Sequence, residues 1–170
     1  MPQNRILRLI LGDQLNLNHS WFKKQDRRVT YVLMEIRQET DYVQHHIQKV
    51  AALFSAMRNF AASLKASGHR VVYIRFDDSQ NAQTLDGNLS RLIKAKKLDR
   101  FEYLLPDEYR LDQQLAEIVR QLPIPGRVAD TEHFLTERRE LKEFFAGRKH
   151  YRMASFYRWM RKRHDILMDN

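Results

Sequence analysis

Cysteine is absent from the 170 residues of this chain. Its absence excludes disulfide bonds, cysteine-ligated zinc, iron–sulfur clusters and thiol nucleophiles from the segment. Glycine and proline are scarce, at five and four residues, which argues against a loop-rich or low-complexity chain. Residues 1–11 lack the pattern of a signal peptide, and no apolar run reaches the roughly 20 residues that a membrane span needs. We therefore expect a folded cytoplasmic protein without a membrane segment.

The common catalytic signatures are missing as well. Neither G-x-x-x-x-G-K-[ST] nor G-x-G-x-x-G occurs, which disfavours ATP hydrolysis and ordinary dinucleotide binding. The seven histidines show no H-E-x-x-H spacing, and the adjacent His45 and His46 would point about 100° apart on a helix, so we expect no metal site. No serine stands in a G-x-S-x-G turn. These signatures therefore assign no catalytic residue to the segment.

The hydrophobic pattern predicts short strands that alternate with helices. Strands are expected at residues 5–11, 29–34, 71–76, 101–105 and 127–129. Helices are expected at residues 45–65, 85–93 and 111–122, with one helical turn inside the loop 16–28. Such alternation is typical of parallel βαβ units with right-handed crossovers. The sequence predicts an α/β fold: a doubly wound, Rossmann-like five-stranded parallel sheet flanked by helices.

The end of the chain has a different character. We expect Thr136 to cap a helix that carries Leu141, Phe144 and Phe145, so that residues 1–135 form the α/β domain and 136–170 a helical connector. Much of the formal charge of +9 lies here, because residues 148–164 hold seven lysines or arginines and no acid. The basic residues expected to contact nucleic acid or another domain are Arg158, Arg161, Lys162 and Arg163. The interleaved aromatic residues allow either role, and packing on another domain is the favoured one.

Polar residues follow three of the predicted strands. They are Gly12-Asp13-Gln14-Leu15, the segment from Glu35 to Glu39, and Asp107-Glu108-Tyr109 after Pro106. Because ligands in parallel sheets bind beyond the carboxyl ends of the strands, we expect these loops to converge on a polar, hydroxylated or heteroaromatic ligand. A purely structural interpretation stays open for each segment, since Gly12 could serve a tight turn and Asp13 or Asp107 could cap a helix.

Four stretches together resemble one family. RILRLILGDQLNLNHSWF, VLMEIRQETDYVQHH, LLPDEYRL and FYRWMRKRHDILMDN are similar to the amino-terminal part of the deoxyribodipyrimidine photolyase-related proteins, which include iron–sulfur bacterial cryptochromes and prokaryotic (6-4) photolyases. The combination of G-D-Q-L-N, M-E-x-x-x-E and P-D-E-Y is far more specific than any one of these motifs. The resemblance runs over essentially the whole chain.

The resemblance implies an antenna domain. Family members continue into a helical domain with FAD, a four-iron (4Fe–4S) cluster and the site for the DNA lesion, so this segment would not be catalytic alone. Its partners would be DNA, through the full-length protein, and the helical flavin domain. The α/β domain would bind 6,7-dimethyl-8-ribityllumazine and pass excitation to the flavin. Matching motifs imply that the cofactor-binding residues are Gly12, Asp13, Gln14, Leu15, Glu35, Ile36, Glu39, Asp107, Glu108 and Tyr109.

Two other classes of function stay open at this point. A self-standing nucleotide-binding or small-molecule-binding enzyme of the same architecture would use Asp13, Glu35 and Asp107 as acids or bases. A basic nucleic-acid-binding module would act through residues 148–164. Whether the parent protein repairs DNA or senses blue light is a further open alternative.

Overall fold

The computed structural model describes residues 4–168 of the chain. The chain separates into two compact units, which meet in sequence between Thr131 and Glu132. The predicted boundary between residues 135 and 136 lies close to this division. Each unit is described by itself below.

A five-stranded parallel sheet forms the first unit. Its strands are β1 (Ile6–Leu9), β2 (Val29–Met34), β3 (Arg70–Ile74), β4 (Arg100–Leu104) and β5 (Gly126–Ala129). Their order in the sheet is β3-β2-β1-β4-β5, and all four pairings are parallel. This arrangement confirms the predicted doubly wound α/β fold. The order reverses beside β1, so the carboxyl ends of β1, β2 and β4 define the place where such sheets bind ligands.

Five helical segments connect the strands. They are the 3₁₀ turn η1 (Ser20–Phe22) and the α-helices α1 (Arg37–Thr40), α2 (Ile47–Ala66), α3 (Leu85–Lys96) and α4 (Tyr109–Gln121). The side chain of Thr84 accepts a hydrogen bond from the backbone N–H of Gly87 and so caps α3. Gly68 follows α2 with a φ of +84°, which is the left-handed conformation that ends helices. The helical turn expected within residues 16–28 is present as η1.

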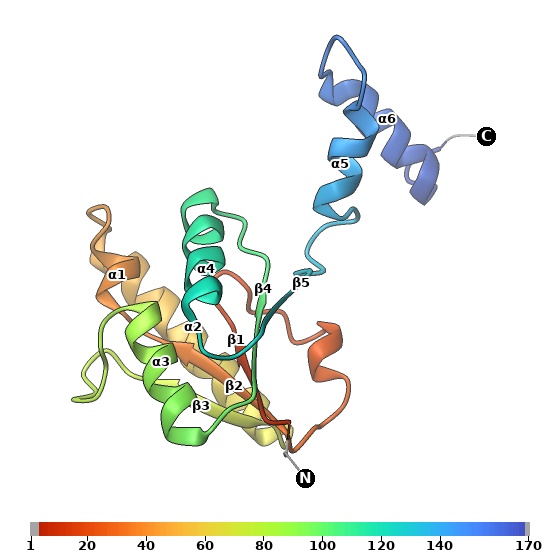
Figure 1. Cartoon of the computed structure of the whole chain (residues 1–170). Helices are drawn as coiled ribbons and strands as arrows, with labels where there is room; N and C mark the ends of the chain where they lie inside the picture. Colours follow the sequence, from red (N-terminus) through yellow and green to blue (C-terminus); the bar gives the residue numbers. More distant parts are fainter. Residues whose placement is uncertain (1–3, 169–170) are drawn as a thin grey trace. The chain divides into compact units, whose positions relative to one another are not determined.

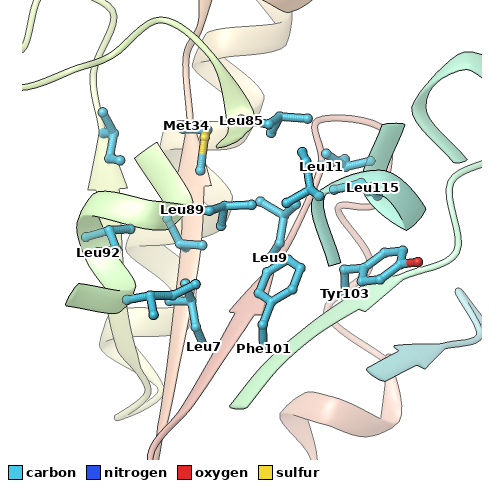
Figure 2. Close-up of a cluster of buried hydrophobic side chains, with 14 of the residues drawn as sticks. Leu7, Leu9, Leu11, Met34, Leu85, Leu89, Leu92, Phe101, Tyr103 and Leu115 are labelled. Atoms are coloured by element: carbon cyan, nitrogen blue, oxygen red, sulfur yellow. The ribbon is translucent and has the colours of Figure 1, made fainter. Parts of the chain in front are cut away.

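Both faces of the sheet are covered by helices, and each face has its own hydrophobic core. Figure 1 shows α3 and α4 on one side of the strands and α2 on the other. Leu7 and Leu9 of β1 pack with Leu89 of α3 and Leu115 of α4 (Figure 2). Tyr31 of β2 packs on the opposite side, with residues of η1 and α2. Burial of each such side chain contributes about 1.5–3 kcal/mol to folding.

Two features of α1 and α2 differ from the sequence-based expectation. The short helix α1 was not predicted, and the amino-terminal end of α2 is not buried. Ile47 is 73% exposed, whereas Met57 and Leu64 further along the helix are buried. The reason is length: α2 has 20 residues and is about 30 Å long, whereas a six-residue strand such as β2 spans about 20 Å. The first turns of α2 therefore extend past the end of the sheet.

The second unit consists of two helices, α5 (Arg138–Phe145) and α6 (Met153–His164). A capping box begins α5, in which Glu137 and Glu140 each accept a hydrogen bond from the other's backbone. The cap is thus Glu137 and not the neighbouring Thr136. Aromatic rings hold the two helices together: the ring of Phe144 lies 5.3 Å from those of both Phe156 and Trp159. Within residues 4–168, none of the helices combines the length and apolar character required to cross a membrane.

Candidate functional site

A cavity of about 280 Å³ lies in the first unit at the carboxyl ends of β1 and β2. Its floor is apolar and its rim is charged. The apolar lining residues are Leu9, Ile10, Leu11, Met34, Ile36, Val50, Leu53, Phe54, Met57, Leu85 and Leu111. The polar lining residues are Asp13, Glu39, Thr40, Tyr42, His45, Lys49 and Glu108. Ligand sites in proteins commonly have this composition, and volumes near the lower end of the usual range of about 300–1,000 Å³ suit a small heteroaromatic molecule.

Gly12 completes the lining where β1 leaves the sheet. A Cβ atom at this position would lie 3.1 Å from Cδ1 of Leu53 and 3.2 Å from Sδ of Met57. Both neighbours belong to α2, so the missing side chain lets that helix approach the end of β1 closely. A larger residue here would push into the cavity or displace α2.

An arginine fixes the acidic part of the rim. Nε of Arg110 donates to Oε1 of Glu108 at 2.7 Å, and its Nη2 donates to Oε2 of Glu39 at 3.2 Å. The same guanidinium lies 4.3 Å from the centre of the Tyr42 ring, a cation–π contact. Arg110 thereby connects α4 with α1 and with the segment that follows α1. These contacts hold the two carboxylates in place.

Gln38 anchors α1 to α3 and α4. Its Nε2 donates to Oε1 of Gln114 at 2.8 Å, and its Oε1 accepts from the backbone N–H of Leu85 at 3.0 Å. Nζ of Lys49 lies 3.4 Å from Nδ1 of His45. The cavity lining thus includes two carboxylates together with a lysine and a histidine.

The structure brings half of the ten predicted cofactor-binding residues to the cavity. The lining includes Gly12, Asp13, Ile36, Glu39 and Glu108. They come from the three loops that were expected to converge. Whether any of these side chains binds a cofactor remains a prediction.

Gln14 and Leu15 have structural environments instead. The buried Oε1 of Gln14 accepts from the backbone N–H of Leu11 at 3.1 Å. Its Nε2 donates to the carbonyls of Leu104 and Leu105 at 3.4 and 3.3 Å. Gln14 thus ties the end of β1 to the end of β4, while Leu15 packs against the hydrophobic core on the α2 side. Both residues shape the turn that supports the cavity floor.

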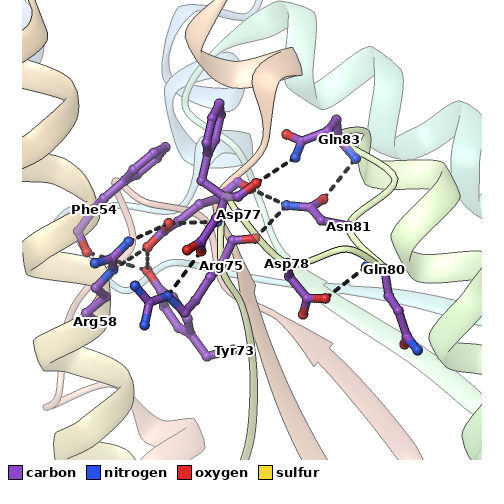
Figure 3. Close-up of polar contacts among 11 residues, drawn as sticks. Phe54, Arg58, Tyr73, Arg75, Asp77, Asp78, Gln80, Asn81 and Gln83 are labelled. Carbon is purple, nitrogen blue, oxygen red and sulfur yellow. Dashed lines mark hydrogen bonds and ion pairs between the residues drawn. The ribbon is translucent and has the colours of Figure 1, made fainter.

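Glu35 lies outside the cavity lining and is fully buried. Its Oε1 accepts from Nε of Arg58 and from the hydroxyl of Tyr73, both at 2.6 Å. Its Oε2 accepts from Nη2 of Arg58 at 2.8 Å and from the backbone N–H of Phe76 at 2.9 Å. Figure 3 shows Arg58 and Tyr73 close together within this network of polar contacts. Glu35 therefore joins β2, α2 and the end of β3.

The protonation state of Glu35 follows from these contacts. Burial alone would raise the pKa of this carboxyl, but the hydrogen bonds from Arg58, Tyr73 and the Phe76 N–H outweigh burial and lower its pKa below 4.5. Burial and the hydrogen bond to Glu35 raise the pKa of Tyr73 above its ordinary value of 10. A carboxylate that is ionised at neutral pH and already accepts four hydrogen bonds is poorly suited to take a proton from a substrate. The alternative of Glu35 as a general base is therefore disfavoured.

Asp107 and Tyr109 lie beside the cavity entrance without lining it. Asp107 is exposed in the loop after β4, and Tyr109, the first residue of α4, is 77% exposed. Sequence reasoning did not single out Tyr42, Lys49, Leu53 or Arg110. Arg110 follows the P-D-E-Y motif directly, but nothing in the sequence signals that its partner Glu39 lies in a different loop.

The four basic residues named on α6 are all exposed, and two of them have partners inside the second unit. Nε of Arg161 donates to the carbonyl of Ile166 at 3.1 Å, and Arg163 forms an ion pair with Glu140 at 2.5 Å. Arg158 and Lys162 form no ion pair with any residue between 4 and 168. Their contact with nucleic acid or with another domain stays a prediction.

The five-stranded parallel sheet with helices on both faces is a doubly wound α/β domain, and its cavity lies at the carboxyl edge, where sheets of this kind bind ligands. The family model described as deoxyribodipyrimidine photo-lyase-related protein matches residues 8–170, and the chain belongs to this family. It is 38% identical over 165 residues to a protein of Agrobacterium fabrum named (6-4) photolyase. That match covers 95% of this chain and 32% of the relative. The chain thus spans about a third of the length of that relative, and the resemblance noted in the sequence is confirmed.

Proposed function

We propose that this chain is the light-harvesting domain of a photolyase-related or cryptochrome-like flavoprotein, and that its cavity binds a ribityl-lumazine. The observation that carries the proposal is the cavity at the carboxyl edge of the sheet, with its apolar floor and its ionised rim. A chromophore bound there would absorb near-visible light and pass the excitation to the FAD of the whole protein. The FAD and the four-iron cluster belong to the part of the family that this chain does not span.

The side chains of the cavity match the chemistry of a lumazine. A flat heteroaromatic ring has apolar faces, which Ile36 from the loop after β2, Leu85 from α3 and Leu111 from α4 could cover. The ring edge and the ribityl chain carry N–H and O–H groups, for which Glu39 and Glu108 offer carboxylate oxygens. A volume of about 280 Å³ is small for a dinucleotide, and no phosphate-binding glycine loop borders the cavity among residues 4–168. These features favour a two-ring chromophore over a nucleotide.

In this proposal the residues position a chromophore and carry out no bond chemistry. Energy transfer depends on a fixed distance and orientation between donor and acceptor, so rigidity of the site matters most. The ion pairs of Arg110 and the hydrogen bonds of Gln38 hold the rim, and Gln14 holds the floor. Light-dependent repair of DNA or blue-light sensing would be the activity of the whole protein. Its cytoplasmic location also stays a prediction.

Chromophore retention tests the proposal directly. Leu53 is 38% exposed and lines the cavity, so Leu53→Trp fills the cavity from its rim without opening the core. We expect the purified wild-type chain to show an absorption band in the near-visible and to release a compound with the mass of a lumazine. The Leu53→Trp chain should lose at least 90% of that compound, about a tenfold weakening of binding or 1.4 kcal/mol.

Tyr109→Phe is the matched control, because Tyr109 lies beside the entrance but outside the lining. This variant should retain the chromophore. Equal retention in wild type and Leu53→Trp would place the ligand elsewhere. Release of ATP or another nucleotide in place of a lumazine would contradict the proposed function.

A further inference from the structure

A second cleft lies at the opposite end of the sheet from the cavity. It has a volume of about 610 Å³ and is formed where β1, β2 and β3 begin and where α3 ends. Five cationic side chains line it: Arg5, Arg28, Arg70, Lys96 and Lys97. The remaining lining residues are Thr30, Val71, Val72, Ala95 and Leu98. The lining holds no acidic residue, and we call this surface the basic cleft.

The charge of the basic cleft is only partly compensated. Arg28 forms an ion pair with Asp26 at 2.7 Å. Lys96 and Lys97 form no ion pair with any residue that the structure describes. Nε of Arg5 is buried without a hydrogen-bond partner in the same range, although a buried cationic donor is costly to leave unpaired.

Local structure alone does not account for this cluster. Lysines in the last turn of a helix are stabilised by the helix dipole, which gives Lys96 an ordinary reason to be there. The dipole does not explain Arg5 and Arg70, which precede or begin strands on separate parts of the sheet. Arg70 uses Nη1 to donate to the carbonyl of Arg27 at 2.7 Å and keeps its other donors. Four separate segments thus bring cations to one concave surface.

We propose that the basic cleft binds the phosphodiester backbone of DNA. Five cations spread along an open cleft suit a chain of phosphates better than a single small anion. We expect the contact to be independent of base sequence, because cations spread over an open cleft attract the phosphates of any sequence. It is separate from the chromophore cavity and from the basic residues of α6.

The salt dependence of DNA binding tests this contact. Each phosphate contact neutralised by a cation contributes about 0.9 to the slope of log K against log salt concentration. The double variant Lys96→Gln/Lys97→Asn removes two cations, and asparagine suits the left-handed φ of 49° at position 97. Fluorescence anisotropy with a labelled, undamaged duplex should show the slope reduced in magnitude by about 1.8. The charge-conserving variant Lys96→Arg/Lys97→Arg should bind like wild type.

Two further double variants serve as controls for charge. Lys23→Gln/Lys24→Gln removes two exposed lysines of the first unit outside the cleft, and Arg158→Gln/Lys162→Gln removes the two unpaired cations of α6. The proposal is overturned if the cleft variant reduces the magnitude of the salt-dependence slope no more than Lys23→Gln/Lys24→Gln does. It is also overturned if the α6 variant alone abolishes binding.

The same variants distinguish binding of DNA from binding to an anionic membrane and from binding of the chromophore. If the cleft variant loses binding to phosphatidylserine vesicles but binds DNA like wild type, the cleft binds membranes. That result would contradict the proposal. Retention of chromophore by the cleft variant is expected, since the two sites lie at opposite ends of the strands. Failure of DNA binding at the cleft is therefore distinguishable from failure of the proposed antenna function.

Discussion

The carboxylate of Glu35 accepts four hydrogen bonds beside the candidate site, and its replacement by glutamine gives a sharp prediction. Glu35→Gln keeps the shape of the side chain but exchanges one acceptor oxygen for an N–H₂ group. Each oxygen of Glu35 accepts two hydrogen bonds. The variant therefore leaves two of the four donors, from Arg58, Tyr73 or Phe76, without an acceptor.

The expected loss of stability follows from these bonds. A hydrogen bond to a charged group contributes about 1.5–3 kcal/mol, so two lost bonds would cost about 3–6 kcal/mol at full burial. The side chain of Arg58 is 45% exposed, and water replaces part of what it loses. We expect a decrease of about 2–4 kcal/mol in the free energy of unfolding. At about 4 °C per kcal/mol, the Tm should fall by about 8–16 °C.

Chemical denaturation followed by circular dichroism measures this difference. Asp77→Asn is the matched control, because Asp77 is on the loop next to the Glu35 network (Figure 3) but its side chain is 74% exposed. Its ion pair with Arg75 at 3.3 Å should contribute less than about 1 kcal/mol. If Glu35→Gln and Asp77→Asn are equally mild, the network around Glu35 does not stabilise the fold as we describe.

Two other predictions concern acid and the core. Because the pKa of Glu35 is lower in the folded state than its ordinary value of 4.5, the unfolded chain takes up the proton first as pH falls. The stabilisation from Glu35 is present above about pH 4.5 and is lost as the pH falls further, so the free energies of unfolding of wild type and Glu35→Gln should converge below about pH 4.5. A difference that stays constant over this range would contradict the lowered pKa. Leu89→Ala, at a fully buried position, should lower the free energy of unfolding by about 2–5 kcal/mol. The same change at Leu17, which is 51% exposed, should alter the free energy of unfolding by less than about 0.5 kcal/mol.

The sequence predicted the fold well because the signals for it are local. Each buried strand is a short run of apolar and β-branched residues, as in Val29–Met34, and each helix has a regular apolar face. Alternation of the two then restricts the topology to a few parallel arrangements. The length mismatch between α2 and the sheet has no local signal, which is why the exposure of Ile47 could not be predicted.

The candidate site was predictable in position but not in detail. Topology places the loops after β1, β2 and β4 together, and the structure confirms that they meet. The direction of each side chain depends on partners that are distant in sequence. Glu35 turns toward Arg58 and Tyr73, and Glu39 toward Arg110. A list of polar residues after strands cannot distinguish a side chain that supports the fold from one that faces a ligand.

The basic cleft was missed for the same reason. Residues 148–164 concentrate positive charge in one stretch of the sequence, so the sequence alone reveals them. Arg5, Arg28, Arg70, Lys96 and Lys97 are scattered over four segments and become a cluster only when the parallel strands begin at one edge. Net charge predicts attraction to polyanions, but the surface responsible depends on the fold.

Titration of the purified chain with 6,7-dimethyl-8-ribityllumazine is the most direct test of the central claim. Quenching or shift of the lumazine fluorescence should reveal saturable binding at one site per chain. The account predicts that Leu53→Trp weakens this binding at least tenfold and that Tyr109→Phe leaves it unchanged. Binding that is equal in all three chains, or absent from the wild type while a nucleotide binds, would contradict the assignment of the cavity to a light-absorbing cofactor.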